Sequence, residues 1–391
     1  MLQPKLRFKE FSEKWQEKKL EEVTSYIDYR GKTPAKTENG IFLVTAKNIK
    51  KGFIDYNSSK EYVSSQSYDE VMKRGKPQIG DVLLTTEAPL GNVAQVDKQN
   101  IALAQRVIKF RGKEKLLDNT FLKYIFLSEG FQTLLRNKAI GTTVLGIQGK
   151  VLHKLVLYIS RDLKEQKKIA DFLSAVDVKL NLTEKKLELL KEYKKGIMQK
   201  IFNQELRFKD NNGNDYPKWE EKKLGNISLI SAGGDIKKEN FSEEKTNEFK
   251  FSVYANSLDK KGLYGYSNIF KVTGESITVT ARGNIGVATY RNENYIPIVR
   301  LLVIKMDSTK YSHKYFSYFI NTIKIIQEVT GVPQLTAPQL KEYKVIYPIS
   351  LEEQQKIADF LSSIDNKIEK IADELENLKE FKKGLLQQMF V

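Results

Sequence analysis

The chain has 391 residues, enough for two domains with buried cores, and its 40% apolar and 10% aromatic content is that of a folded protein rather than a disordered or fibrous one. Its 65 Lys and Arg residues outnumber 49 Asp and Glu residues and give a net charge of +16. Such a surplus favours a polyanionic partner, because each phosphate that a cation neutralises releases a counterion. The lack of cysteine excludes disulfides and thiolate zinc sites, and we expect the two histidines, His153 and His313, to be packing or surface residues.

No segment of the sequence is long and apolar enough to suggest a membrane span. The best apolar run, 295–304, is short and contains Arg300. The first eleven residues lack the apolar centre of a signal peptide. We therefore expect a cytoplasmic protein.

Elements of two kinds follow one another along the chain. Short β-branched and aromatic runs at 41–45 and 81–86, broken by turn residues, predict strands, and 120–138 predicts a helical stretch. A long helix is predicted next, at 163–202. The same order returns with strands at 276–280 and 299–305, a helical stretch at 311–329 and a second long helix at 351–390. The predicted domains are 1–160 and 206–350, and the predicted helical regions are 161–205 and 351–391.

An internal repeat explains this order. Residues 163–202 and 351–390 align without gaps at an offset of 188 and share 22 identities. LRFK at 6–9 returns at 206–209, and Trp15 returns as Trp219 after four extra residues. Residues 80–96 resemble 274–290 more faintly. The chain is therefore predicted to consist of two divergent copies of one module.

The repeated segments carry apolar residues at alternating steps of four and three, which is the 3.5-residue period of a coiled coil. Both segments share one register over more than four heptads. The predicted seam consists of Ile169, Leu173, Val176, Leu180, Leu187, Leu190, Ile197 and Ile201 in the first segment, and of Ile357, Leu361, Ile364, Ile368, Ile371, Leu375, Leu378, Leu385 and Met389 in the second.

Charge indicates that the two helices pair with each other. Residues 163–202 have a net charge of +4 and residues 351–390 one of −3. Packing of each helix on its own domain is the alternative. Antiparallel pairing would relate the modules by a pseudo-two-fold axis, one at each end of a rod of roughly 50 Å. The helices together hold +1 of the +16, so the surplus lies in the mixed domains, where we expect nucleic acid to bind.

The order of the motifs resembles the specificity subunits of type I restriction-modification systems. The resemblance covers nearly the whole chain and rests on two EQ-x-x-IA-x-FL helix starts, at 165–173 and 353–361, and on two LRF-x(n)-W-x-x-KKL openings. Asp177 and Asp365 belong to it, as do Gly80 and Asp81 and the run at 30–34 (RGKTP). The second copy departs from the first where GESITV replaces GDVLLT.

The resemblance implies an α+β fold with two pseudo-symmetric target-recognition domains separated by a pair of long antiparallel coiled-coil helices. Each domain would read one half of a bipartite duplex DNA site. The helices would set the spacer and dock two modification subunits, which use S-adenosylmethionine, and two restriction subunits would use ATP and Mg²⁺. No cofactor is expected on this chain.

Little in the sequence indicates that the chain is an enzyme. An adenine methyltransferase needs Asn or Asp before Pro-Pro and an aromatic residue, and the chain has no Pro-Pro. GKT at 31–33 lacks the earlier glycine of a phosphate loop, and Gly283 to Gly286 reads as a hairpin turn. A nuclease with scattered carboxylates stays open, as do a coiled-coil scaffold and an RNA-binding protein.

DNA contacts require Arg, Lys, Asn, Gln or Thr side chains on loops. The candidates in the first module are Arg30, Lys32, Thr33, Lys47, Asn48, Thr85, Thr86, Gln105, Arg106, Thr142, Thr143 and Gln148. Those in the second are Asn256, Lys260, Lys261, Thr280, Arg282, Asn284, Arg300 and Gln334. No residue is predicted to be catalytic or to bind a metal.

Overall fold

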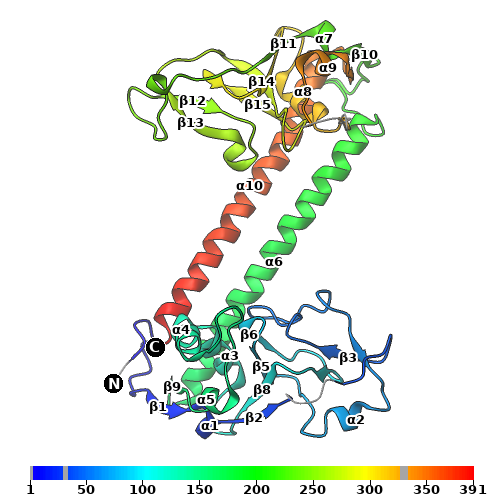
Figure 1. Cartoon of the computed structure of the whole chain (residues 1–391). Coiled ribbons are helices and arrows are strands. Elements are labelled where there is room, and N and C mark those ends of the chain that lie inside the picture. Colours follow the sequence, from blue (N-terminus) through cyan, green and yellow to red (C-terminus); the bar gives the residue numbers. More distant parts are fainter. Residues whose placement is uncertain (1–2, 30–33, 326–332) are drawn as a thin grey trace. The chain divides into compact units, whose positions relative to one another are not determined.

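The computed structural model describes residues 3–29, 34–325 and 333–391. The chain divides into two compact units, Met1–Lys185 with Asp373–Val391, and Lys186–Ala372. Each unit contains one mixed α/β domain and a part of each long helix, α6 (Leu163–Phe202) and α10 (Leu351–Gln388) (Figure 1).

The first domain is built on two small sheets. One is antiparallel with the order β2-β8-β5-β6, and the other has the order β4-β3-β7, in which β3 and β7 run parallel. A third, two-stranded pairing joins β1 to β9. The elements are β1 (Gln16–Lys19), α1 (Leu20–Val23), β2 (Thr24–Asp28), β3 (Ile41–Val44), β4 (Tyr62–Val63), α2 (Tyr68–Val71), β5 (Val82–Thr86), β6 (Leu90–Gln95), β7 (Ala102–Leu103), β8 (Val107–Gly112), α3 (Asn119–Leu127), α4 (Glu129–Lys138), α5 (Gly149–Leu152) and β9 (Val156–Ile159).

The second domain repeats this topology strand for strand. Its sheets have the orders β11-β17-β14-β15 and β13-β12-β16, β12 and β16 run parallel, and β10 pairs with β18. The elements are β10 (Glu220–Lys223), α7 (Leu224–Ile227), β11 (Ser228–Ala232), η1 (Lys238–Asn240), β12 (Phe251–Tyr254), η2 (Asp259–Gly262), β13 (Leu263–Ser267), β14 (Glu275–Val279), β15 (Ala288–Asn292), β16 (Tyr295–Pro297), β17 (Leu302–Met306), α8 (His313–Ile320), α9 (Ala337–Glu342) and β18 (Lys344–Tyr347). The predicted fold class, two mixed domains of repeated architecture with long antiparallel helices, is confirmed.

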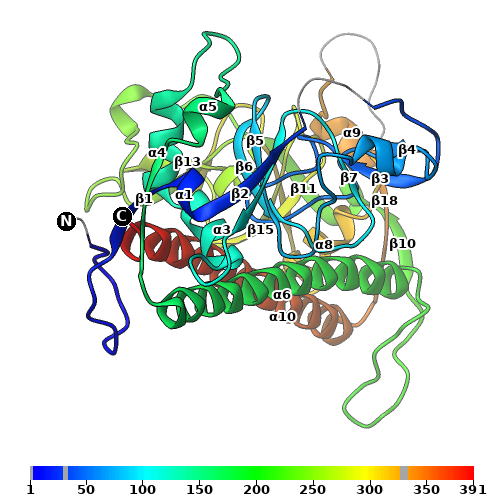
Figure 2. The ribbon, with the colours of Figure 1, turned by 90° about the horizontal axis from the view of Figure 1, so that it is seen from below.

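The core of each domain includes the end of a long helix that the sequence assigns to the other module. Phe390, two residues after the end of α10, packs edge-on against Trp15, with ring centroids 6.4 Å apart. Phe202, at the end of α6, packs in the same way against Phe319, at 5.4 Å. Both ribbon views place the C-terminus near β1 and α4 of the first domain (Figures 1 and 2). Each domain therefore buries an aromatic residue from the helical segment of the other module.

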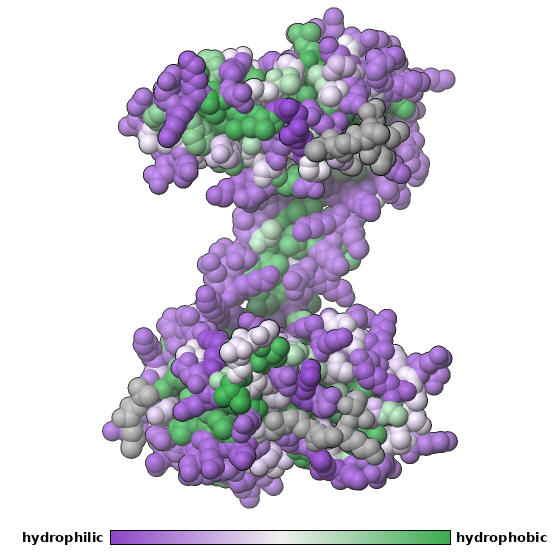
Figure 3. Space-filling view, viewed as in Figure 1, coloured by the Kyte–Doolittle hydropathy of each residue, from purple (hydrophilic) through white to green (hydrophobic). Residues whose placement is uncertain are grey.

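The two helices run antiparallel within each unit. In the first unit, Lys179 on α6 lies 3.3 Å from Glu374 on α10. In the second, Lys194 lies 2.6 Å from Asp365. All the predicted seam positions are buried or half-buried, and hydrophilic side chains cover most of the outer helix surface (Figure 3). The helices thus pair with each other, and the start of each helix also packs on its own domain.

The predicted local elements differ from the structure in three places. The stretch 120–138 is two helices, because Ser128 has an extended backbone and caps α4 through its side chain. Of the stretch 311–329, only α8 is helical among the described residues. The strand predicted at 299–305 begins at Leu302, since Val299 and Arg300 have φ of 46° and 63°, which a strand cannot contain.

Within the described residues, no helix has both the length and the apolar character needed to cross a membrane.

Candidate nucleic-acid interface

The repeated Glu-Gln pair ties each long helix to the start of its own module. Buried Glu165 accepts hydrogen bonds from Arg7 Nε at 2.6 Å and Trp15 Nε1 at 3.2 Å. Glu353 accepts them from Arg207 Nη2 at 2.9 Å and Trp219 Nε1 at 3.1 Å. The hydrogen bond to Glu165 raises the pKa of Arg7. The LRF, Trp and EQ motifs therefore act together as a structural junction.

The glutamine of each pair anchors the helix to its domain. Gln166 accepts from the backbone N–H of Asp118, the N-cap of α3, at 2.9 Å and donates to the carbonyl of Ser160 at 2.8 Å. Gln354 accepts from the N–H of Ser312, the N-cap of α8, at 2.8 Å and donates to the carbonyl of Pro348 at 2.8 Å. An amide can do both at once, which explains why glutamine stands here in both copies.

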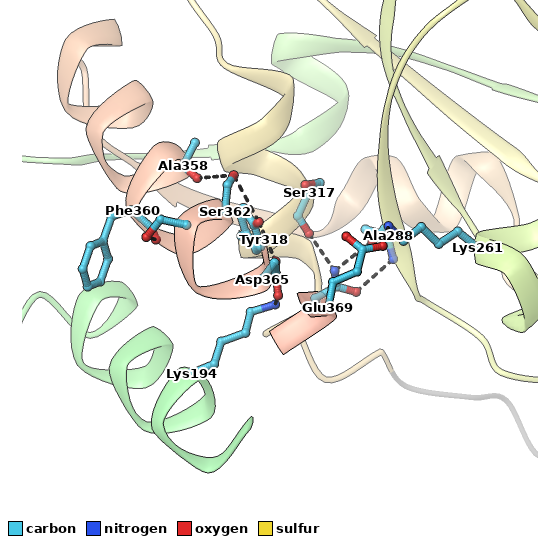
Figure 4. Close-up of polar contacts among 12 residues, drawn as sticks. Lys194, Lys261, Ala288, Ser317, Tyr318, Ala358, Phe360, Ser362, Asp365 and Glu369 are labelled. Atoms are coloured by element: carbon cyan, nitrogen blue, oxygen red, sulfur yellow. Dashed lines mark hydrogen bonds and ion pairs between the residues drawn. The ribbon is translucent and has the colours of Figure 1, made fainter. Parts of the chain in front are cut away.

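A second repeated contact joins each domain to its helix pair. Tyr318 on α8 donates a hydrogen bond to Asp365 on α10 at 2.7 Å, and Lys194 reaches the same carboxylate (Figure 4). In the first domain, Tyr124 on α3 donates to Asp177 on α6 at 2.8 Å. Burial raises the pKa of both tyrosines, so each stays a neutral donor. These contacts hold each domain on the long helices.

Three of the predicted contact residues come together in the second domain. Arg282 follows β14, Arg300 precedes β17 and Gln334 precedes α9. The Gln334 Oε1 atom accepts from Arg300 Nη1 at 2.5 Å and from Arg282 Nη2 at 3.4 Å. Arg282 Nε is buried without a hydrogen-bond partner among the described residues. Two guanidinium groups therefore converge on one amide, and such groups read base edges and phosphates.

Asn256, which we predicted to contact DNA, instead fixes the two loops that carry these arginines. Asn256 donates through its amide to the carbonyl of Val299 and accepts from the N–H of Ala281 at 2.6 Å. It thereby links the residue before Arg300 to the residue before Arg282. The left-handed backbone of Arg300 needs such support, because that conformation is uncommon for residues other than glycine.

The first domain presents an arginine in the equivalent connection. Arg106 directly precedes β8, whereas Arg300 stands two residues before β17, and both have a positive φ, of 73° and 63°. The Arg106 Nε atom lies 3.7 Å from Oε2 of Glu87, and the Arg106 carbonyl accepts a hydrogen bond from Thr86 at 3.0 Å. A cavity of about 260 Å³ beside it is lined by Lys36, Lys47 and Gln105 among others. Both domains thus expose a basic side chain in the same connection.

The other predicted contact residues fall into three groups. Lys47, Thr142, Thr143, Gln148, Lys260, Lys261 and Asn284 are exposed, and Gln105 is half-buried. Buried Asn48, Thr85, Thr86 and Thr280 make hydrogen bonds inside the domains; the Asn48 amide alone bonds to the backbone of Thr45, Asp55 and Ser59. Arg30, Lys32 and Thr33 lie outside the described residues.

Comparison with known proteins agrees with the repeated architecture. The family model described as "Type I restriction modification DNA specificity domain" matches residues 12–192 and again 216–380. Two proteins named as type I specificity subunits in Mycoplasma pneumoniae are each 33% identical to this chain, over 223 and 150 residues, and the matches span 59% and 44% of their lengths.

Two matches extend over nearly the whole chain. The MjaVIII type I restriction enzyme specificity subunit of Methanocaldococcus jannaschii is 25% identical over an alignment of 405 positions, gaps included, which covers 96% of this chain and 91% of that one. The crystal structure of the type I restriction-modification S subunit from M. genitalium superposes with a TM-score of 0.69 at 17% identity, covering 100% and 99% of the chains, and so shows a shared fold. Because the family model matches both halves of the chain, the protein belongs to the type I restriction-modification DNA specificity family.

Proposed function

We propose that this chain is the subunit that reads DNA sequence in a type I restriction-modification complex. Each domain reads one half of a bipartite duplex site, and the paired helices set the spacer between the halves. As a member of its family the chain is a non-catalytic specificity subunit, so its chemistry is recognition.

One observation carries this proposal. Arg106 and Arg300 lie in the same connection of two domains of the same topology, one and two residues before the equivalent strands β8 and β17, but their surroundings differ. Arg106 faces the carboxylate of Glu87, whereas Arg300 faces the amide of Gln334. The two domains share one topology, but different side chains lie beside their arginines. This arrangement suits two domains that bind DNA in the same manner and select different bases. The exposed and half-buried candidates other than Asn256 are retained as contacts, and Asn256 and the four buried candidates are assigned to structural support.

The partners follow from the family. The complex contains two modification subunits, which carry S-adenosylmethionine, and two restriction subunits, which use ATP and Mg²⁺. The paired helices dock the modification subunits. A complex of this kind acts on cytoplasmic DNA.

Exchange of one recognition region tests the proposal. Residues 25–140 are replaced by the matching region of another specificity subunit, and the methylated sites are mapped by sequencing after addition of the modification subunit. We expect one half-site to change and the other to stay. A change in both half-sites, or in neither, would contradict independent reading by the two domains.

A scaffold without a nucleic-acid role is the competing function, and salt dependence separates the two. Lysine and arginine contacts to phosphates produce a steep fall in affinity for duplex DNA as salt rises. An assembled complex that shows no DNA binding at low salt would favour the scaffold. Tighter binding to single-stranded RNA than to duplex DNA would favour an RNA-binding protein.

A further inference from the structure

A short hairpin of the first domain, residues 140–146, exposes three aliphatic side chains. Ile140 is 60% exposed, Val144 50% and Leu145 44%. A single exposed apolar residue is ordinary, but a group of them in one loop marks a contact with another molecule. A cavity of about 490 Å³ lies beside the hairpin, and its lining includes Val144 and Leu145 together with Leu90 and Leu135. The domain thus leaves an apolar surface uncovered at this place.

A fixed turn, rather than an open loop, exposes these side chains. Ile140 and Gly146 exchange both backbone hydrogen bonds, at 2.8 and 2.9 Å, which closes a loop of five residues. At Gly141 the φ angle is 117°, and a Cβ atom there would lie 2.2 Å from the carbonyl oxygen of Val144. Only glycine fits such a position. The backbone of the hairpin therefore holds the apolar side chains in place before any ligand arrives.

The hairpin is joined directly to the segment that faces Arg106. Gly146 forms an antiparallel bridge with Glu87, and the N–H of Ile147 donates to the carbonyl of Thr86 at 3.1 Å. Oε2 of the same Glu87 lies 3.7 Å from Nε of Arg106. The apolar surface is therefore continuous with the place where the first domain is proposed to read DNA.

The charge around the hairpin suits a polyanion. Lys51 and Arg136 line the cavity, and none of the described residues in its lining is acidic. Arg136 lies 2.9 Å from Glu129, but both side chains are exposed, and such pairs contribute little energy. Exposed Thr142 and Thr143 belong to the same hairpin. A surface with cations and without carboxylates attracts the phosphate backbone and brings the hairpin against the bases.

We propose that Val144 and Leu145 pack against the C5-methyl group of a thymine in the half-site that the first domain reads. This inference rests on the proposed function. Thymine is the base that presents a methyl group in the major groove, where the other bases present hydrogen-bonding groups. The hairpin thus adds apolar readout beside the polar readout of Arg106, and the first half-site contains an A·T pair at this place.

A contact with the edge of a base fits the hairpin better than insertion between bases. Side chains that act as wedges enter between two base steps and unstack them. About half of Val144 and of Leu145 is already covered by the domain. The part that stays free is enough to cover a methyl group, whereas a wedge needs a whole side chain that projects from the surface.

Removal of the methyl group from DNA tests the proposal on the full chain in complex with the modification subunit. The duplex carries the site identified by sequencing of methylated DNA, and the thymines of each half-site are replaced in turn by deoxyuridine, which lacks only the methyl group. We expect replacement in one half-site to weaken binding about fourfold, the effect of exposing one methyl-sized group. Fluorescence anisotropy measures the affinity.

The variant Val144→Ser with Leu145→Ser removes the partner of the methyl group. It should bind the thymine duplex at least about fourfold more weakly and lose nothing further with deoxyuridine, because either change breaks the same contact. The matched control is Ile79→Ser with Leu116→Ser, two exposed apolar residues of the same domain outside the cavity lining. The control should keep the preference for thymine. Circular dichroism melting shows that each variant is folded.

The outcomes separate this inference from the proposed function. If the unmodified complex does not bind its own site, the proposed function fails. If it binds but neither half-site distinguishes thymine from deoxyuridine, or if the double serine variant keeps that distinction, the methyl contact is overturned while the function stands. Loss of the modification subunit from the double serine variant, counted by native mass spectrometry, would make the hairpin a protein contact instead.

Discussion

The Lys382 Nζ atom lies 2.5 Å from Oδ1 of Asp177, and the repeat of this pair, Lys194 with Asp365, is 2.6 Å apart. The two lysines stand at equivalent positions of the seam in the two helices. Each lysine reaches the aspartate of the other helix in only one antiparallel alignment, because a shift by one heptad would place the lysine among apolar side chains. The two pairs therefore specify the alignment of the helices, as single polar seam residues do in other coiled coils.

Replacement of Lys382 by Met should reduce the stability of the first unit by about 1–3 kcal/mol, because Asp177 would lose a hydrogen-bonded cation where both side chains are about four-fifths buried. Urea unfolding measures the change. The matched control is Lys179→Met, which breaks the exposed pair with Glu374 and should cost less than about 1 kcal/mol. Equal effects of the two substitutions would mean that burial does not strengthen the seam pair.

Glu165→Gln should loosen the junction of the first module and leave the second intact. The neutral amide has one acceptor oxygen where the carboxylate has two, so it cannot accept both hydrogen bonds of the largely buried Arg7, and we expect a loss of about 2–3 kcal/mol. Hydrogen-exchange mass spectrometry should show faster exchange around β1 and the start of α6. Glu353→Gln is the reciprocal variant and should act on the second module. Faster exchange in both modules from either change would show that the junctions are not independent.

Phe390→Ala should destabilise the first domain although residue 390 lies at the far end of the sequence. The ring is buried against Trp15 and Phe121, and its loss from a core costs about 3–5 kcal/mol. Hydrogen exchange should rise in peptides from α3, near residue 121. Phe202→Ala should instead affect α8, through Tyr315 and Phe319. Faster exchange in α8 after the Phe390 substitution would contradict this assignment.

Insertion of one heptad after Thr183 and another after Ile371 should lengthen the spacer of the DNA site. Both insertions keep the seam in phase, and seven residues add about 10 Å of helix, or roughly three base pairs. Three base pairs also turn the duplex by roughly 100°, so affinity should fall. Selection of methylated sites from a library with randomised spacers gives the new length. An unchanged spacer would show that the helices do not set it.

Arg300→Ala should weaken binding to the native site by about 1–3 kcal/mol, at least fivefold, and relax the choice of base in one half-site. Arg300→Lys keeps the positive charge but lacks the paired N–H donors of a guanidinium group. Compared with Arg300→Ala, it should therefore recover attraction to phosphates but not the base preference. Arg106→Ala should relax the other half-site. Methylation of a library randomised in both half-sites measures this. Unchanged base preference in Arg300→Ala would remove Arg300 from the reading surface.

Sequence alone predicted the features that depend on periodicity and repetition. The seam from Ile169 to Ile201 and its copy follow from a 3.5-residue spacing that any long paired helix requires. Duplication of the module follows from the offset of 188 between the two long helical segments. Local signals also gave the turn between Gly283 and Gly286, which joins β14 to β15.

Tertiary structure decided what each polar residue does. Asn48, Thr85 and Thr280 are residue types that contact DNA bases, yet folding buries them. Their side chains form hydrogen bonds inside the domains with the same donors and acceptors that base readout would need. Asn256, Arg282, Arg300 and Gln334 lie up to 78 positions apart in sequence, and only strand pairing brings them to one place. Periodicity reports which face of an element is buried, whereas contact between distant loops depends on packing that no local spacing encodes.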